Sequence, residues 1–109
     1  MTVNNLKNLI HPVCNIAIQA GEIIKKYYKS KIDFTLKGDN SPLTQADLES
    51  NNLIKNELKK INNAIPILSE ESIIDWSTRK NWETYWLVDP LDGTKEFIKK
   101  NNEFTVNIA

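Results

Sequence analysis

The sequence is poor in the residues that define several large classes of protein. Among its 109 residues are one cysteine, Cys14, and one histidine, His11, so an internal disulfide framework is excluded. Its 14 basic and 14 acidic side chains cancel, so no overall charge favours a nucleic-acid polymer or an anionic membrane. The first residues do not have the basic start and long apolar run that are typical of a secretory signal, and no apolar run in the sequence approaches the ~20 residues of a transmembrane segment. We expect a cytoplasmic protein with a local charged-ligand site, and peripheral contact with the inner membrane stays open.

The first half of the sequence contains two helical patterns. Apolar residues recur at spacings of three and four over residues 6–28, which predicts an amphipathic helix that Pro12 kinks or restarts. Gly21 lies inside this pattern at a cost of ~1 kcal/mol, which close packing of another element could offset. A second helix is predicted to begin at Thr44, with Asp47 completing an approximate capping box. Its predicted buried face consists of Ala46, Ile54, Leu58 and Ile61.

Short strand-like segments separate and follow these helices. We predict strands at residues 32–36, 65–68, 85–88 and 104–109, with a polar loop at 37–42 and a short helix from Lys95 through Ile98. The alternation indicates an α/β or α+β fold. The last segment, FTVNIA, has no turn after it, so we expect residues 1–109 to be one portion of a single domain. Missing sequence, a partner or a second copy would then pair with the open strand.

The segment WLVDPLDGTKEF, residues 86–97, combines a strand with two carboxylates. Leu87 and Val88 are typical of a buried strand, and a buried strand end is a costly place for Asp89 and Asp92 unless a cation or strong donors bind them. By itself the pattern also fits an ordinary turn followed by a helix cap.

A second acidic segment follows the predicted strand at residues 65–68. If that strand lies beside the strand at 85–88, Glu70 meets Asp89 and Asp92 in one pocket. Glu71 is then either a solvated neighbour or a group that supports the ligands without binding the metal. Three carboxylates repel one another unless divalent cations are present. Oxygen ligands without nearby His or Cys favour Mg²⁺, and two such ions ~3.5 to 4 Å apart can activate water against a phosphate ester.

Three segments resemble motifs of one enzyme family. They are SPLTQAD at 41–47, LSEES at 68–72 and WLVDPLDGT at 86–94. They are similar to motifs of the lithium-sensitive, magnesium-dependent phosphatases that include inositol monophosphatase and the 3'(2'),5'-bisphosphate nucleotidases. The resemblance implies a layered αβαβα sugar-phosphatase-like fold, of which this chain is the N-terminal part. The segments KGDNSPLT, TKEF and FTVNIA look most like the bacterial CysQ-type nucleotidases.

The same resemblance implies a set of metal ligands. Glu70, Asp89 and the carbonyl of Leu91 would bind one Mg²⁺, and Asp89 would bridge to a second ion that Asp92 also binds. Inhibition by Li⁺ is expected from the family. Family members are longer than this chain, and their second half supplies a further aspartate ligand, so we expect these residues alone to be inactive.

The resemblance also implies how the substrate is bound and attacked. Thr94 and Asp47 would orient the attacking water, the amides of Gly93 and Thr94 would bind the phosphate, and Lys37 would contact that phosphate or a metal-bound water. The implied reaction is removal of the 3'-phosphate from adenosine 3',5'-bisphosphate to leave AMP. Hydrolysis of inositol monophosphate is the alternative within the same chemistry. A non-catalytic metal- or phosphate-binding module, or a partner subunit, is the alternative of another class.

Overall fold

The computed structural model describes residues 3–28, 34–37, 42–99 and 104–109 of the chain. Helices and short strands alternate along these ranges, as the sequence predicts. In chain order the elements are α1 (Val3–Tyr28), β1 (Phe34–Leu36), β2 (Pro42–Thr44), α2 (Gln45–Ile61), β3 (Ile67–Ser69), α3 (Trp76–Arg79), β4 (Trp86–Asp92), α4 (Thr94–Lys99) and β5 (Thr105–Ile108).

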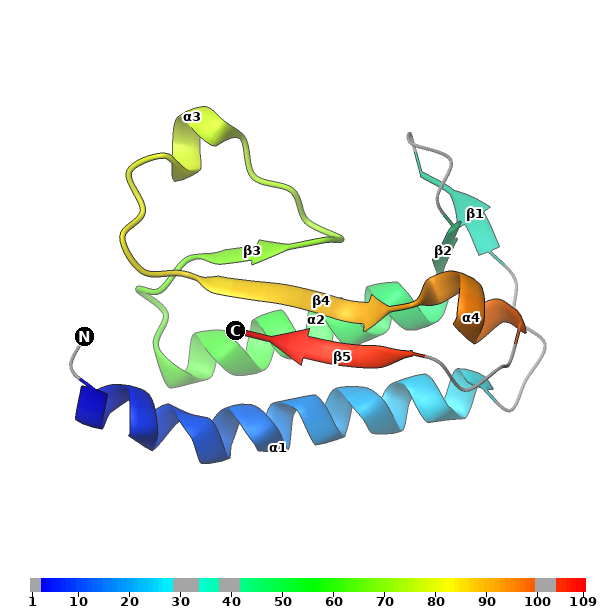
Figure 1. The fold of residues 1–109 in the computed structure, drawn as a ribbon, viewed down its shortest axis with the longest axis horizontal. Helices are drawn as coiled ribbons and strands as arrows, with labels where there is room; N and C mark the ends of the chain where they lie inside the picture. Colours follow the sequence, from blue (N-terminus) through cyan, green and yellow to red (C-terminus); the bar gives the residue numbers. More distant parts are fainter. Residues whose placement is uncertain (1–2, 29–33, 38–41, 100–103) are drawn as a thin grey trace.

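The main sheet has the strand order β3-β4-β5. β3 pairs with β4 in parallel, and β5 pairs with β4 in the antiparallel direction. β1 and β2 form a separate antiparallel pair. The long helices α1 and α2 lie side by side and cover one face of the main sheet, with α2 against β4 and α1 against β5 (Figure 1). The predicted α/β class is therefore confirmed. None of the helices in the described ranges is long and apolar enough to cross a membrane.

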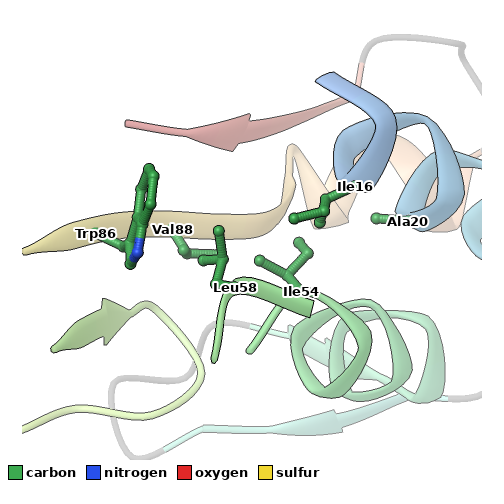
Figure 2. Packing of buried hydrophobic residues seen from close by; sticks show 6 residues of the cluster. All are labelled: Ile16, Ala20, Ile54, Leu58, Trp86 and Val88. Atoms are coloured by element: carbon green, nitrogen blue, oxygen red, sulfur yellow. The ribbon is translucent and has the colours of Figure 1, made fainter. Parts of the chain in front are cut away.

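The core lies between the two long helices and the sheet. Figure 2 shows its central side chains converging from three elements: Ile16 and Ala20 from α1, Ile54 and Leu58 from α2, and Trp86 and Val88 from β4. The spacing of three and four residues along each helix produces this arrangement, because it places apolar side chains on one face. A second buried cluster, nearer the carboxyl end of β4, contains Ile24, Ala46, Leu91 and Phe97.

The start of α2 agrees closely with the sequence. The backbone amide of Asp47 donates to Thr44 Oγ1, and the Asp47 carboxylate accepts from the backbone amide of Thr44, which completes the capping box. Of the predicted apolar face, Ala46, Ile54 and Leu58 are fully buried and Ile61 is partly buried. The cap matters for the site because it orders Asp47 at the first turn of the helix.

Two local predictions need correction. Of the two alternatives at Pro12, a restart is wrong, because α1 is a single helix through that position. Leu87 is 51% exposed, because it points to the sheet face that α1 and α2 do not cover.

The strand boundaries also differ from the sequence prediction. β4 continues beyond residue 88 to Asp92, and Pro42, the last residue of the predicted loop at 37–42, is the first residue of the strand β2. Parts of the predicted strand at 32–36, of that loop and of the turn before residue 104 lie outside the described residues.

Gly21 provides a test of helix propensity in α1. A Cβ added at this position has no neighbouring atom within 4 Å beyond the helix backbone, so the predicted close packing of another element is wrong. Gly21→Ala should therefore raise the free energy of unfolding by about 1 kcal/mol, measured by urea denaturation. Ala17→Gly in the same helix is the matched control and should lower it by a similar amount. A loss of stability in Gly21→Ala would contradict the open surroundings of this position.

Candidate functional site

The two acidic segments lie side by side, one directly after β3 and the other in the second half of β4. In the parallel register, Ser69 at the end of β3 lies opposite Val88 of β4. The backbone amide of the next residue, Glu70, donates to the carbonyl of Val88 at 3.1 Å. Glu70 therefore follows β3 at the level where Asp89 follows Val88. The neighbouring strands expected from the sequence are present, and they place the two acids beside each other.

A β-bulge in β4 changes which way its second acid points. Asp89 pairs with Asn107 and Asp92 pairs with Thr105, so three steps along β4 match two steps along β5. In a regular strand, residues an odd number apart point to opposite faces. The extra residue of the bulge restores the match, so Asp89 and Asp92 share one side of the strand. The buried residues between them, Pro90 and Leu91, face the interior.

The pKa of Asp89 depends on its burial and on the neighbouring carboxylates. Burial raises the pKa of Asp89 to about 6, and the negative charges of Asp92 and Glu70 add to the effect. Hydrogen bonding at the Leu91 backbone opposes it in part. Within the described residues, however, no group of three Asp, Glu, His or Cys side chains converges on a single metal position. The acids are thus neighbours on one side of the sheet without forming a closed ligand cage.

Asp47 and Thr94 are joined across the site. The Asp47 side chain is fully buried, and its Oδ1 accepts a hydrogen bond from Thr94 Oγ1 at 3.0 Å. Its Oδ2 accepts from the backbone amide of Thr44 at 2.8 Å and also from the Thr44 hydroxyl. Both oxygens of this buried carboxylate therefore have donors, and α2 is connected to the start of α4. The catalytic role of the pair stays a prediction.

The chain turns sharply between β4 and α4. Gly93 has φ 88°, a left-handed conformation that residues with a Cβ rarely adopt, and its carbonyl accepts from the amide of Phe97 at 2.9 Å. This places the amides of Gly93 and Thr94 at the beginning of α4. The carbonyl of Leu91, a predicted metal ligand, lies 3.3 Å from Thr94 Oγ1, and a carbonyl oxygen retains a second lone pair for a cation.

Lys37 has a partner that the sequence did not predict. Its Nζ donates to Glu71 Oε1 at 2.9 Å. Burial opposes the charged form of Lys37, but Glu71 and the nearby acids outweigh it, so the pKa of Lys37 is raised. The Glu71 side chain is only 5% exposed, which excludes the solvated alternative. Burial raises the pKa of Glu71, and the charge of Lys37 offsets only part of that effect.

Sequence reasoning missed a set of buried hydrogen bonds on α2. Ser50 donates to the carbonyl of Pro90 at 2.7 Å, and Asn51 bonds to Ser69 and Ser72 on either side of the two glutamates. A signal was present, because Ser50 and Asn51 follow Asp47 by three and four residues and so lie on the same helix face. These side chains were overlooked because only apolar residues were assigned to that face.

An apolar cavity of about 100 Å³ lies near the other end of β4. Its lining consists of Leu6, Leu9, Ile65, Thr84, Tyr85, Trp86 and Ala109. No charged side chain belongs to that lining, so the cavity lacks the groups that would bind a phosphate. The carboxylates of Glu70, Asp89 and Asp92, which we call the acidic edge, remain the candidate site.

Comparison with known proteins identifies relatives over nearly the whole chain. The family model described as the inositol monophosphatase family matches residues 5–109. The chain is 49% identical to the 3'(2'),5'-bisphosphate nucleotidase CysQ of Buchnera aphidicola, with 99% of this chain and 42% of the relative aligned. It is 48% identical to CysQ of Escherichia coli K12, over 93% of this chain and 42% of the relative. The chain thus spans about two-fifths of the length of these relatives.

Solved structures give the same assignment. CysQ from Bacteroides thetaiotaomicron superposes with a TM-score of 0.74 at 49% identity, over 91% of this chain and 36% of that structure. The suppressor protein suhB from Bartonella henselae superposes with a TM-score of 0.80 at 31% identity, over 94% of this chain and 40% of that structure. By sequence motif, family match and backbone arrangement, the chain belongs to the inositol monophosphatase family.

Proposed function

We propose that this chain contributes the carboxylate side of the active site in a Mg²⁺-dependent phosphomonoesterase. The observation that carries the proposal is the side-by-side placement of two acidic segments, next to the hydrogen-bonded pair of Asp47 and Thr94. Carboxylates supply cation ligands, and a threonine hydroxyl bonded to a buried carboxylate can relay a proton from water to that carboxylate. A phosphate ester is a substrate that needs both functions.

We propose adenosine 3',5'-bisphosphate as the substrate, with AMP and phosphate as products. The relatives at 48–49% identity are bisphosphate nucleotidases by name, whereas the solved inositol monophosphatase from Anabaena is 22% identical. This difference supports the nucleotide over inositol monophosphate. We also propose that the protein is located in the cytoplasm. The single cysteine agrees with a reducing compartment, and the described ranges contain no membrane-spanning helix.

The donor chemistry of the acidic edge fits Mg²⁺. Glu70, Asp89, Asp92 and the Leu91 carbonyl offer only oxygen atoms, which Mg²⁺ prefers. We propose that the first two acids and the carbonyl hold one ion, and that Asp89 and Asp92 hold a second. Bound there, the ions would activate a water and stabilise charge on the phosphate oxygens. Li⁺ is proposed as an inhibitor of the same site.

The protein's own groups would direct the proton and the phosphate. Thr94 donates its hydroxyl hydrogen to Asp47, so the Thr94 oxygen would accept the proton of an attacking water while its own hydroxyl proton passes to the Asp47 carboxylate. Asp47 would therefore be the final proton acceptor, and Thr94 would relay the proton. The amides of Gly93 and Thr94 would bind the substrate phosphate. Lys37 would act on that phosphate only by sharing or leaving its ion pair with Glu71.

We propose that these residues act within a longer enzyme, since the chain spans about 42% of its curated relatives. A further carboxylate from the remaining part would complete the second cation site, and these residues alone would be inactive. The alternative is a non-catalytic module that binds metal or phosphate. The edge strand β5 could serve such a module by pairing with a partner or a second copy.

The substrate proposal is tested by comparing two phosphate esters with the complete enzyme. We expect hydrolysis of adenosine 3',5'-bisphosphate to have a higher kcat/KM than hydrolysis of inositol 1-phosphate, with phosphate release as the measurement. Chelation of Mg²⁺ should abolish both activities. A preference for the inositol ester would contradict the proposed substrate, and Mg²⁺ binding without turnover of either ester would favour the non-catalytic module.

Two variants of Thr94 distinguish the role of its hydroxyl group from the role of its side-chain shape. Thr94→Val keeps the size of the side chain but removes the proton-accepting oxygen, so kcat should fall by about 10²-fold or more. Thr94→Ser retains the hydroxyl and serves as the matched control, with kcat expected within a few fold of wild type. Steady-state kinetics at saturating Mg²⁺ measures both. Equal rates for the valine and serine variants would remove Thr94 from proton transfer.

The acidic edge also makes stability depend on pH. Because the pKa of Asp89 is about 6 in the fold and 3.8 without its surroundings, the native state binds more protons than the unfolded state between these values. The metal-free free energy of unfolding should therefore fall as pH rises from about 4 to about 6, and Mg²⁺ should counteract this fall. Urea denaturation at several pH values measures the effect. If the free energy of unfolding of Asp89→Asn falls with pH as steeply as that of the wild type, another group is responsible.

A further inference from the structure

The buried face of α2 contains three polar residues among apolar ones. Asp47 and Ser50 are completely buried and Asn51 is 4% exposed, while Ile54 and Leu58 continue the same face into the core. Buried polar groups are costly unless they are hydrogen-bonded. All three are bonded, and each reaches a different segment of the candidate site.

Asn51 holds the turn that carries the two glutamates. Its Oδ1 accepts from Ser69 Oγ at 2.6 Å, and its Nδ2 donates to Ser72 Oγ at 2.9 Å. The turn is closed by the amide of Ser72, which donates to the carbonyl of Ser69 at 3.1 Å. One buried side chain therefore binds both ends of a four-residue turn. Glu70 and Glu71 lie between those ends.

Ser50 holds the other acidic segment. Its hydroxyl donates to the carbonyl of Pro90 at 2.7 Å, and Pro90 lies in the bulge between Asp89 and Asp92. A bulge leaves its extra residue outside the regular ladder, so this bond fixes backbone that the sheet does not. Because Ser50 and Asn51 are adjacent in one helix, the helix backbone sets the spacing between their two partners.

We propose that Ser50 and Asn51 are positioning residues, through which α2 sets the separation between the Glu70 turn and the Asp89–Asp92 segment. This inference rests on the proposed function, because its consequence is the affinity of the acidic edge for a divalent cation. The sheet fixes that separation only in part. β3 pairs with β4 over three residues, Ile67–Ser69, and the last backbone bond between the two segments runs from the Glu70 amide to the Val88 carbonyl. The rest of the turn lies beyond the paired strands.

Hydrogen bonds that only stabilise the fold and hydrogen bonds that position metal ligands have different effects when they are removed. If these bonds only stabilise the fold, their removal lowers the melting temperature and leaves the Mg²⁺ dependence unchanged. If they position ligands, their removal weakens Mg²⁺ binding, while excess Mg²⁺ restores kcat. The two effects are measured separately.

The test uses the complete enzyme and changes at Ser72, which is partly exposed and is not a proposed ligand. Ser72→Ala removes the acceptor of the Asn51 amide, whereas Ser72→Thr keeps a hydroxyl there. We expect Ser72→Ala to raise the Mg²⁺ concentration for half-maximal activity by about 10-fold, with kcat at saturating Mg²⁺ close to wild type. Ser72→Thr should behave as wild type.

A second pair of variants addresses the helix itself. Asn51→Ala should weaken Mg²⁺ binding at least as much as Ser72→Ala, and Asn52→Ala, at the exposed next position of α2, should leave it unchanged. Calorimetric titration with Mg²⁺ supplies a readout that does not require turnover. Where Asn51→Ala fails to fold, the Ser72 pair decides the result.

The outcomes separate this inference from the proposed function. An enzyme that hydrolyses neither ester would refute the function, and a weaker Mg²⁺ affinity of Ser72→Ala by calorimetry would still support positioning. An unchanged Mg²⁺ affinity and activation curve in Ser72→Ala would overturn the inference, even if the phosphatase activity is as proposed.

Discussion

The candidate site depends on the parallel pairing of β3 with β4. That register places Ser69 opposite Val88, so Glu70, the residue after β3, lies beside Asp89 of β4. The bulge that follows brings Asp92 to the same side of the strand. Like charges brought together in this way repel one another, and burial together with the charges of Asp92 and Glu70 raises the pKa of Asp89. The fold thus maintains an arrangement of acids that a divalent cation would stabilise.

α2 supports this arrangement from the opposite side. Its capping box orders Asp47, which binds Thr94 at the start of α4, and the next helical turn contacts the two acidic segments. The apolar part of the helix packs against β4 in the core (Figure 2). Packing and polar contacts therefore act on the same element, so the hydrophobic core indirectly determines where the site residues lie.

Much of this could be predicted from the sequence, because its signals are local. The spacing of apolar residues predicted α1 and α2, and the Thr44 to Asp47 interval predicted the capping box. The acidic segments and their neighbouring strands also followed from the pattern. The bulge could not be predicted, since it depends on pairing with β5 far along the chain. The contact between Lys37 and Glu71 and the buried roles of Ser50 and Asn51 likewise require tertiary structure.

The central claim is that Glu70, Asp89 and Asp92 form a divalent-cation site. The most direct measurement is a crystal structure of the complete enzyme soaked with Mn²⁺, a Mg²⁺ substitute with an anomalous signal. We predict an anomalous peak bounded by Glu70, Asp89 and the Leu91 carbonyl. A peak elsewhere, or Glu70 directed away from a bound ion, would contradict the account.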